Sequence, residues 1–268
     1  MNPTLPSRAL AQQVVVSKSS VLKTLNKDSK MHPYKIALVH QIKETDYRRR
    51  VRYCEWLETH VTNEGDDILD NTFWSDDAWF HLSGFVNRQN CRIWHIENPH
   101  AFHERPLHSE KIGVWCAMSR SKIIGPIFFN ETVTADRYQH QILMPFLELL
   151  DQNQINTATT WFQQDGATAH TARTSLRFLE DIYEDRVISK GIWPARSPDL
   201  TPLDFFLWGY LKGRVYKNNP QTIDELKAAI TLEIQGILQI TLHKTFENMM
   251  KRARKCQEVN GGHFQIFM

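Results

Sequence analysis

Three aspartates that lie far apart in the sequence are candidates for binding catalytic metal ions. Asp76 follows Phe73-Trp74-Ser75, Asp165 follows a strand-like run at residues 161–164, and Asp204 lies in the first turn of an expected helix. Two hard cations that bridge a phosphodiester need carboxylates on rigid backbone, because Mg²⁺ takes few protein ligands and keeps water for the reaction. One ion could activate water or a 3′-hydroxyl, and the other could stabilise the departing oxygen.

Each of these acids also has a purely structural explanation. Asp76 and Asp77 could be strand-end residues facing solvent, and Asp165 begins an Asp-Gly turn dipeptide. Asp204, at the third position of a helix, would stabilise the helix dipole by about 0.3–1 kcal/mol without any metal. Because most aspartates are simply exposed, spacing alone favours the structural explanation for each acid taken singly.

The elements that would position these acids form a mixed pattern of strands and helices. Short apolar or β-branched runs predict strands at residues 72–75, 91–96, 112–118, 123–129, 159–163 and 187–188. Helices are predicted at residues 135–150 and 171–183, between the later strands. This order indicates an α/β sheet covered by helices.

The last quarter of the chain is predicted to be helical. Thr201 would cap a helix with Pro202 at its first position and Asp204 at its third. Thr222 and Glu225 form a capping box that opens another helix, and residues 245–257 form the last one.

Two short helices are predicted near the start of the chain, at residues 7–14 and 17–25, with Ser17 as the cap of the second. Ala11, Val15 and Val21 have the spacing of a helix-turn-helix, although such turns usually have Gly where Val15 stands. An ordinary amphipathic helix pair is the alternative.

Composition narrows the class of protein. The 268 residues are 41% hydrophobic and 23% charged, which is typical of a globular protein, and no apolar run approaches the roughly 18 residues of a membrane span. The four cysteines form no CxxC pair, so neither a disulfide framework nor a thiolate zinc site is indicated. We expect a reducing compartment and neither secretion nor membrane insertion.

Basic residues are concentrated near the start. Residues 1–60 contain 11 Lys and Arg against 5 Asp and Glu, whereas the remainder contains 21 against 25. Arg48, Arg49 and Arg50 are candidates for phosphate contacts or nuclear import, or else they form a solvated helix face. We predict a helix-turn-helix segment at residues 1–30, a basic helical linker at 31–69 and a catalytic domain at 70–268.

Two further groups of side chains could carry chemistry. His100, His103 and His108 could bind a metal, but they lie in a Pro-rich stretch without an obvious fourth ligand. Trp161, Trp193 and Trp208 could stack on flipped bases, although their apolar flanks favour packing in the core.

The residues around the three acids give them a common meaning. Ser75-Asp76-Asp77, residues 164–170 and residues 197–204 closely resemble the catalytic motifs of mariner-type DDE/D transposases. The resemblance extends from about Ser7 to the terminal residues 260–264. It therefore covers nearly the whole chain.

This resemblance implies a ribonuclease H-like mixed sheet flanked by helices. It assigns catalysis and metal binding to Asp76, Asp165 and Asp204, with Asp77 in place of the usual following Glu, and it includes His170 in the second motif. The implied cofactor is Mg²⁺ or Mn²⁺, as two ions. Asp199 is a rival for the third position, but we interpret it as a turn or capping acid.

The resemblance also implies DNA recognition through two helix-turn-helix units that read terminal inverted repeats. Residues 7–25 resemble only the second unit, so we expect the first to be missing from this chain. Lys18, Ser19 and Lys23 of the expected recognition helix are available for phosphates or base edges.

The implied activity is that of a nuclear DNA transposase. It would cut at transposon ends and join them to target DNA, with a homodimer holding two ends. The alternatives are a truncated or domesticated relic that only binds DNA, and a stand-alone nuclease without strand transfer.

Overall fold

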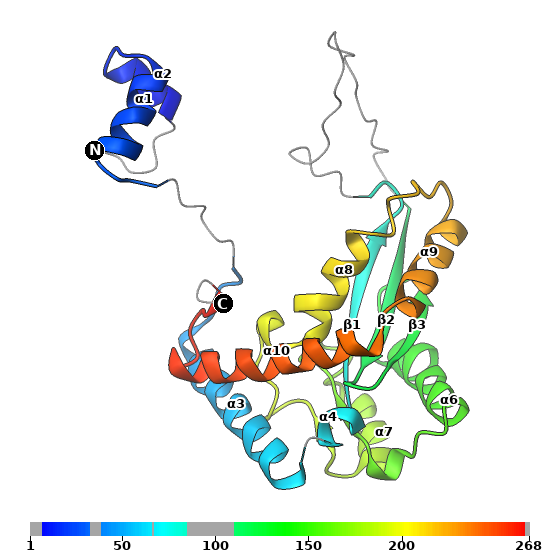
Figure 1. The fold of residues 1–268 in the computed structure, drawn as a ribbon. Helices are drawn as coiled ribbons and strands as arrows, with labels where there is room; N and C mark the ends of the chain where they lie inside the picture. Colours follow the sequence, from blue (N-terminus) through cyan, green and yellow to red (C-terminus); the bar gives the residue numbers. More distant parts are fainter. Residues whose placement is uncertain (1–6, 33–38, 66, 85–109, 266–268) are drawn as a thin grey trace. The chain divides into compact units, whose positions relative to one another are not determined.

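The computed structural model describes residues 7–32, 39–65, 67–84 and 110–265 (Figure 1). The chain divides into two compact units, Met1–Val39 and His40–Met268, and each is described by itself. The predicted strand at residues 91–96 lies outside the described residues, as do His100, His103 and His108. Among the described residues, no helix combines the length and the apolar character needed to cross a membrane.

The first unit contains the two predicted helices. Helix α1 is Ser7–Gln13, helix α2 is Lys18–Lys23, and a π-helical turn, η1 at Thr24–Asp28, continues α2. Ser17 caps α2, because its Oγ accepts a hydrogen bond of 3.0 Å from the backbone N–H of Ser20. Ala11 and Val21 are buried, as expected for the contact between helices of a helix-turn-helix.

The second unit is built on a five-stranded mixed sheet with the order β3-β2-β1-β4-β5. The strands are β1 (Thr72–His81), β2 (Lys111–Met118), β3 (Ile123–Phe129), β4 (Trp161–Gln163) and β5 (Val187–Ile188). Strands β1, β2 and β3 pair antiparallel, whereas β4 lies parallel to both β1 and β5. The mixed pairing puts β1 at the centre of the sheet.

Helices cover both faces of this sheet (Figure 1). One core joins the sheet to α3 (Glu44–Glu64), α8 (Trp208–Lys212), α9 (Ile223–Gln235) and α10 (Gln239–Glu258). A second core joins it to η2 (Tyr138–Leu143), α6 (Met144–Gln152) and α7 (Arg173–Tyr183). The shorter elements are α4 (Asp67–Asn71), α5 (Ala135–Arg137), η3 (Thr157–Thr159), η4 (Pro198–Leu200) and η5 (Leu203–Leu207).

The alternation of side chains along β1 explains the two cores. Trp74 and Phe80 belong to the first core, whereas Phe73 belongs to the second, because successive strand residues point to opposite faces. The predicted α/β sheet covered by helices is therefore confirmed.

Several elements differ from their predicted bounds. Strand β1 continues to His81, because β2 pairs with it as far as Lys111, so Asp76 lies inside the strand rather than at its end. Helix α10 begins at Gln239, six residues earlier than predicted, and the additional turn buries Leu242.

The start of the helix that carries Asp204 also differs. It begins as a π-helical turn, η5, rather than as a capped α-helix. The Oγ1 atom of Thr201 finds no hydrogen-bond partner among the described residues, so Thr201 does not act as the predicted side-chain cap.

Helix α3 lies within residues 31–69, the predicted linker, and packs on α10 in the second unit. Tyr53, Cys54 and Leu57 of α3 are buried in the first core. The compact second unit thus begins near His40, before the predicted start of the catalytic domain.

Candidate active site

The three aspartates singled out by the sequence line one cavity. It has a volume of about 500 Å³, and Asp76, Asp165 and Asp204 all lie on its wall. The other polar side chains of the wall are His40, Ser75, Asp77, Gln163, Arg196, Ser197 and Thr201. Sequence reasoning missed His40, whose only signal was its position in the basic segment before α3.

The parallel pairing of β1 and β4 brings the first two acids together. Trp74 of β1 pairs with Gln163 of β4. Asp76 lies two residues after Trp74, and Asp165 lies two residues after Gln163. Asp76 stays within β1, whereas Asp165 lies in the loop that begins where β4 ends. Asp77 points to the opposite face of β1 from Asp76, because side chains alternate along a strand.

Asp76 is held by a buried tryptophan. The Nε1 atom of Trp208, at the start of α8, donates a hydrogen bond of 2.7 Å to Oδ2 of Asp76. Burial raises the pKa of Asp76 well above its usual value, and the charge of Asp204 raises it further, while the Trp208 bond opposes both effects. No local pattern around Trp208 indicated this role.

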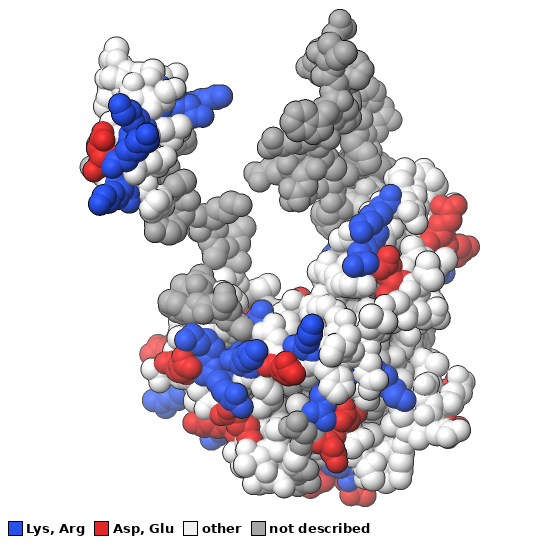
Figure 2. All heavy atoms as spheres, viewed as in Figure 1, with Lys and Arg blue, Asp and Glu red and all other residues white. Residues whose placement is uncertain are grey.

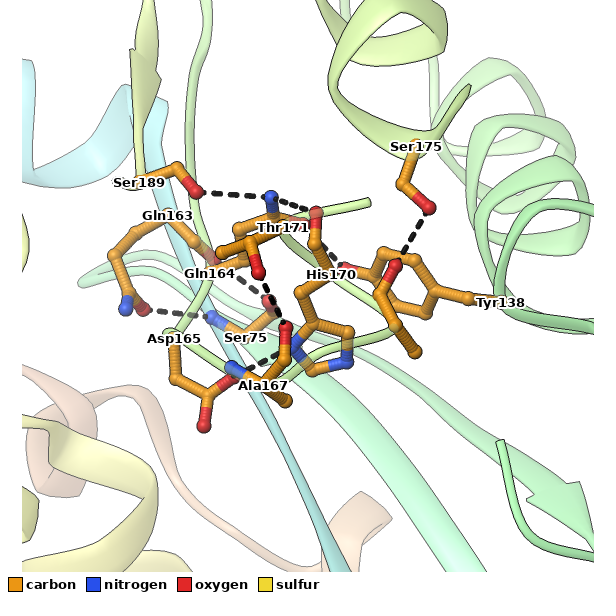
Figure 3. Close-up of polar contacts among 11 residues, drawn as sticks. Ser75, Tyr138, Gln163, Gln164, Asp165, Ala167, His170, Thr171, Ser175 and Ser189 are labelled. Carbon is orange, nitrogen blue, oxygen red and sulfur yellow. Dashed lines mark hydrogen bonds and ion pairs between the residues drawn. The ribbon is translucent and has the colours of Figure 1, made fainter. Parts of the chain in front are cut away.

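Asp165 has a different environment (Figure 3). Its Oδ1 lies 2.5 Å from Nδ1 of His170 and also accepts a 3.0 Å hydrogen bond from the backbone N–H of Ala167. Burial favours a higher pKa for Asp165, but the bond and electrostatic attraction from His170 outweigh it and lower the pKa. Both contacts use Oδ1, which leaves Oδ2 available to a ligand.

A network behind His170 fixes its ring (Figure 3). The rings of His170 and Tyr138 lie 4.1 Å apart between centroids, with an interplanar angle of 34°. The Tyr138 hydroxyl donates to Oε1 of Gln164 at 2.9 Å. Gln164 in turn donates through Nε2 to the carbonyl of His170 at 2.9 Å and to Oγ of Ser189 at 3.0 Å.

Ser75 ties β1 to β4 beside the acids (Figure 3). Its Oγ donates a 2.6 Å hydrogen bond to the carbonyl of Gln163, and its backbone N–H donates to Oε1 of Gln163 at 3.2 Å. Ser75 and Gln163 are both buried. The backbone that carries Asp76 and Asp165 is therefore fixed on both strands.

Asp204 completes the acidic wall from η5. It is solvent-exposed, yet desolvation by the surrounding protein and the charge of Asp165 raise its pKa to about 7, and Lys212 opposes this rise. Burial is the main cause of the raised pKa values of Asp76, Asp77 and Asp204, and the charge of neighbouring carboxylates raises each of them further. A divalent cation would relieve that repulsion.

The chemistry of the donors suits a hard divalent cation, although the three carboxylates do not converge on one point in this structure. Carboxylate oxygens from β1, the β4 loop and η5 surround one cavity, and oxygen ligands are those that Mg²⁺ prefers. Within the described residues, no group of three or more His, Cys, Asp or Glu side chains forms a ready metal cluster.

Asp199, the rival third acid, is buried in an ion pair. Arg50 of α3 donates to its two carboxylate oxygens through Nη1 at 2.7 Å and Nη2 at 2.6 Å. Asp199 lies in the 3-10 turn η4, as expected of a turn acid, but its side chain caps no helix: it is 6% exposed and is the buried partner of Arg50.

The three arginines of α3 that were predicted to contact DNA differ in their exposure. Arg50 has no exposed surface, so this side chain cannot reach DNA, and its assignment as a DNA contact is corrected. Arg48 and Arg49 are exposed and, with Arg52, line a hollow of about 480 Å³ on α3. Figure 2 shows basic side chains gathered where α3 begins and α10 ends.

In the first unit, Lys18, Ser19 and Lys23 are all exposed on α2. They are accessible, as contacts from a recognition helix must be. Their predicted role in DNA binding stays a prediction.

The tryptophans have packing roles. Trp208 and Trp193 are buried in the first core, and Trp193 also lines the cavity. Trp161 packs edge-on against Trp56, with ring centroids 5.8 Å apart. All three thus pack in or against the first core, as their apolar flanks indicated, and Trp208 also donates to Asp76.

Two curated proteins are similar to this chain in sequence. The chain is 23% identical over 274 residues to the human (Homo sapiens) histone-lysine N-methyltransferase SETMAR, which covers 98% of this chain and 38% of that protein. It is 29% identical over 179 residues to the Tc3 transposase of Caenorhabditis elegans, which covers 65% of this chain and 51% of that protein. The chain thus spans about half or less of the length of these relatives. No protein-family profile matches it.

Solved structures show the same fold. The Mos1 transposase in a paired-end complex with the left transposon end has a TM-score of 0.80 at 21% identity, over 98% of this chain and 76% of that one. The catalytic domain of Mos1 mariner transposase has a TM-score of 0.65 at 21% identity, over 85% of this chain and 100% of that domain. The ribonuclease H-like fold and the resemblance to mariner-type transposases are thereby confirmed.

Proposed function

We propose that this chain, a relative of the mariner-type transposases, is a metal-dependent DNA endonuclease and strand transferase that cuts transposon ends and joins them to target DNA. The observation that carries the proposal is the meeting of Asp76, Asp165 and Asp204 around one cavity. The similarity to Mos1 structures in complex with a transposon end supports DNA as the substrate.

Mg²⁺ or Mn²⁺, as two ions, is the proposed cofactor, and it would supply charge stabilisation and an activated oxygen nucleophile. Mos1 paired-end complexes have been solved with each of these metals. Asp76, Asp165 and Asp204 would hold the ions. The chain's own contribution is to orient the acids: His170 and Ala167 leave Oδ2 of Asp165 open, and Trp208 directs Asp76.

The proposed partners are the inverted repeats at transposon ends and the target DNA, bound by a homodimer in the nucleus. Lys18, Ser19 and Lys23 would contact the ends, and Arg48 and Arg49 would contact backbone phosphates. The exposure of these side chains supports the assignment. Phosphate contacts predict binding that weakens steeply as salt is raised.

The test is cleavage of a labelled DNA that carries a transposon end and its flank. Asp165→Ala should abolish nicking with Mg²⁺ or Mn²⁺ while the fold and DNA binding persist. Asp181→Ala, at an exposed position on α7, is the control and should cleave like the wild type. Equal nicking by the wild type and Asp165→Ala would reject the assignment.

The same assay distinguishes the alternatives. A DNA-binding relic would bind the end without nicking it, and a stand-alone nuclease would nick it without joining the freed 3′-hydroxyl to a second DNA. Binding compared on inverted-repeat and random DNA at several salt concentrations separates specific recognition from charge-driven contact.

A further inference from the structure

We infer that two ion pairs made by α3 position the segment that carries Asp204 into the cavity. We call them the α3 clamp: Asp46 with Arg196, and Arg50 with Asp199. In this role the four residues act through Asp204 and touch no reacting atom. The inference rests on the proposed function, because it concerns the third acid of the same site.

The inner pair of the α3 clamp is fully desolvated. Arg50 is 0% exposed and binds Asp199 through two parallel hydrogen bonds of 2.7 and 2.6 Å. Its remaining donors bind Oγ of Ser197 at 2.9 Å and the carbonyl of Gly261 at 2.8 Å. One guanidinium therefore joins α3, the segment before Asp204 and the turn after α10 in fixed geometry.

The outer pair repeats this arrangement one helical turn earlier. Arg196 donates to the two carboxylate oxygens of Asp46 through Nε and Nη2, both at 2.6 Å. Asp46 is also 0% exposed and accepts a 2.9 Å hydrogen bond from the backbone N–H of Lys43. Positions 46 and 50 lie on one face of α3, because residues four apart are neighbours on a helix.

The need for such a clamp follows from the weak start of η5. No side-chain cap fixes this helix start, and Oγ1 of Thr201 has no partner within the described structure. The backbone before Asp204 is instead held at residues 196–199, where Arg252 also donates to the carbonyl of Asp199 at 3.2 Å. Breaking a buried ion pair leaves an uncompensated buried charge, so these pairs favour one arrangement of the segment before Asp204.

Arg196→Ala tests the outer pair at a partly exposed position, where the side chain of Arg196 is 37% exposed, and the protein should still fold. Asp199→Asn tests the inner pair and keeps the shape of the side chain. Arg196→Lys keeps the positive charge but lacks the planar guanidinium that donates two parallel hydrogen bonds. It should therefore restore Mn²⁺ binding only in part, relative to Arg196→Ala. Leu150→Ala, in the core on the opposite face of the sheet, is the control for general loss of stability.

We expect Mn²⁺ binding to the full chain, followed by electron paramagnetic resonance, to weaken about 10- to 100-fold in Arg196→Ala and Asp199→Asn, as when groups that orient a metal ligand are lost. Nicking should fall at limiting Mn²⁺ and recover in part at saturating Mn²⁺. DNA affinity should be unchanged in Asp199→Asn, whose side chain does not line the cavity. Hydrogen exchange without metal should speed up at the amides of Leu200 and Phe205. Leu150→Ala should show none of these local effects.

The inference is overturned if Arg196→Ala and Asp199→Asn match Leu150→Ala in Mn²⁺ affinity and in exchange at Leu200 and Phe205. It also fails if Arg196→Lys gives no recovery relative to Arg196→Ala. Absence of nicking by the wild type would count against the proposed function alone, because metal binding and hydrogen exchange still decide whether the α3 clamp positions this segment.

Discussion

Nε1 of Trp208 donates a hydrogen bond of 2.7 Å to Oδ2 of Asp76, so a side chain of α8 fixes the orientation of an acid on the central strand. The bond also favours the ionised form of Asp76 against the effect of burial. An indole N–H is a donor only, and it bonds more strongly to the charged carboxylate than to the neutral acid. The relationship links the hydrophobic core to the proposed metal site.

Trp208→Phe removes this donor and keeps an aromatic ring. We expect the pKa of Asp76 to rise further and Mn²⁺ binding to weaken about 10- to 100-fold, most strongly at low pH, where protons compete with the metal. Mn²⁺ titrations at several pH values measure this effect. Trp56→Phe, which changes a tryptophan outside the cavity, should leave the affinity unchanged, and equal affinity in both variants would contradict the assigned role.

His170→Phe should move the acidic limb of nicking to higher pH. His170 supplies the hydrogen bond and the electrostatic attraction that hold the pKa of Asp165 below its ordinary value. Without them, burial would raise that pKa. A pH–rate profile at fixed Mn²⁺ measures the shift. His140→Phe, at an exposed position on η2, serves as the control, and coincident profiles for the two variants would rule out this role of His170.

The metal-free protein should become less stable as pH rises from about 4 to about 7. The pKa of Asp204 is raised from 3.8 to about 7 in the folded state, so across this window the folded state binds more protons than the unfolded state, and stability falls with pH. Asp204→Asn should flatten this slope and raise the melting temperature at pH 8, whereas Asp181→Asn should not. Mn²⁺ should stabilise the wild type most at pH 7–8, and a slope unaltered by Asp204→Asn would count against the raised pKa.

Val15→Gly should stabilise the first unit by about 1 kcal/mol, because a β-branched residue in the left-handed region is strained. Val15 has a φ of 51° and is 88% exposed, so glycine relieves strain without loss of packing. Hydrogen exchange at α1 and α2 amides in the intact chain measures the gain. Val16→Gly, at a position without positive φ, should instead lower protection, and equal effects of both substitutions would contradict the explanation.

The sequence predicted those features that local patterns determine. Apolar and β-branched runs located β2, β3, β4 and β5 to within two residues but only the first four residues of β1, and Ser17 identified the start of α2. The residues around Asp76, Asp165 and Asp204 predicted a common site, and the structure brings all three to one cavity.

Long-range pairing could not be predicted in this way. Arg48, Arg49 and Arg50 are equivalent in the sequence, but only Arg50 faces inward, toward an acid 149 positions away. The second half of β1 is a strand because it pairs with β2. No local sequence pattern indicated this pairing. Such relationships arise only once the sheet and helices are packed.

The most direct test of the central claim is Mn²⁺-dependent cleavage of transposon-end DNA by Asp76→Asn, Asp165→Asn and Asp204→Asn, measured in parallel with Mn²⁺ binding. Loss of one ligand should remove charge stabilisation of several kcal/mol from the transition state. Each variant should therefore cleave at least about 100-fold more slowly than the wild type, bind less Mn²⁺ and retain DNA binding. Wild-type cleavage and Mn²⁺ binding by any one of the three would contradict the assignment of a shared metal site.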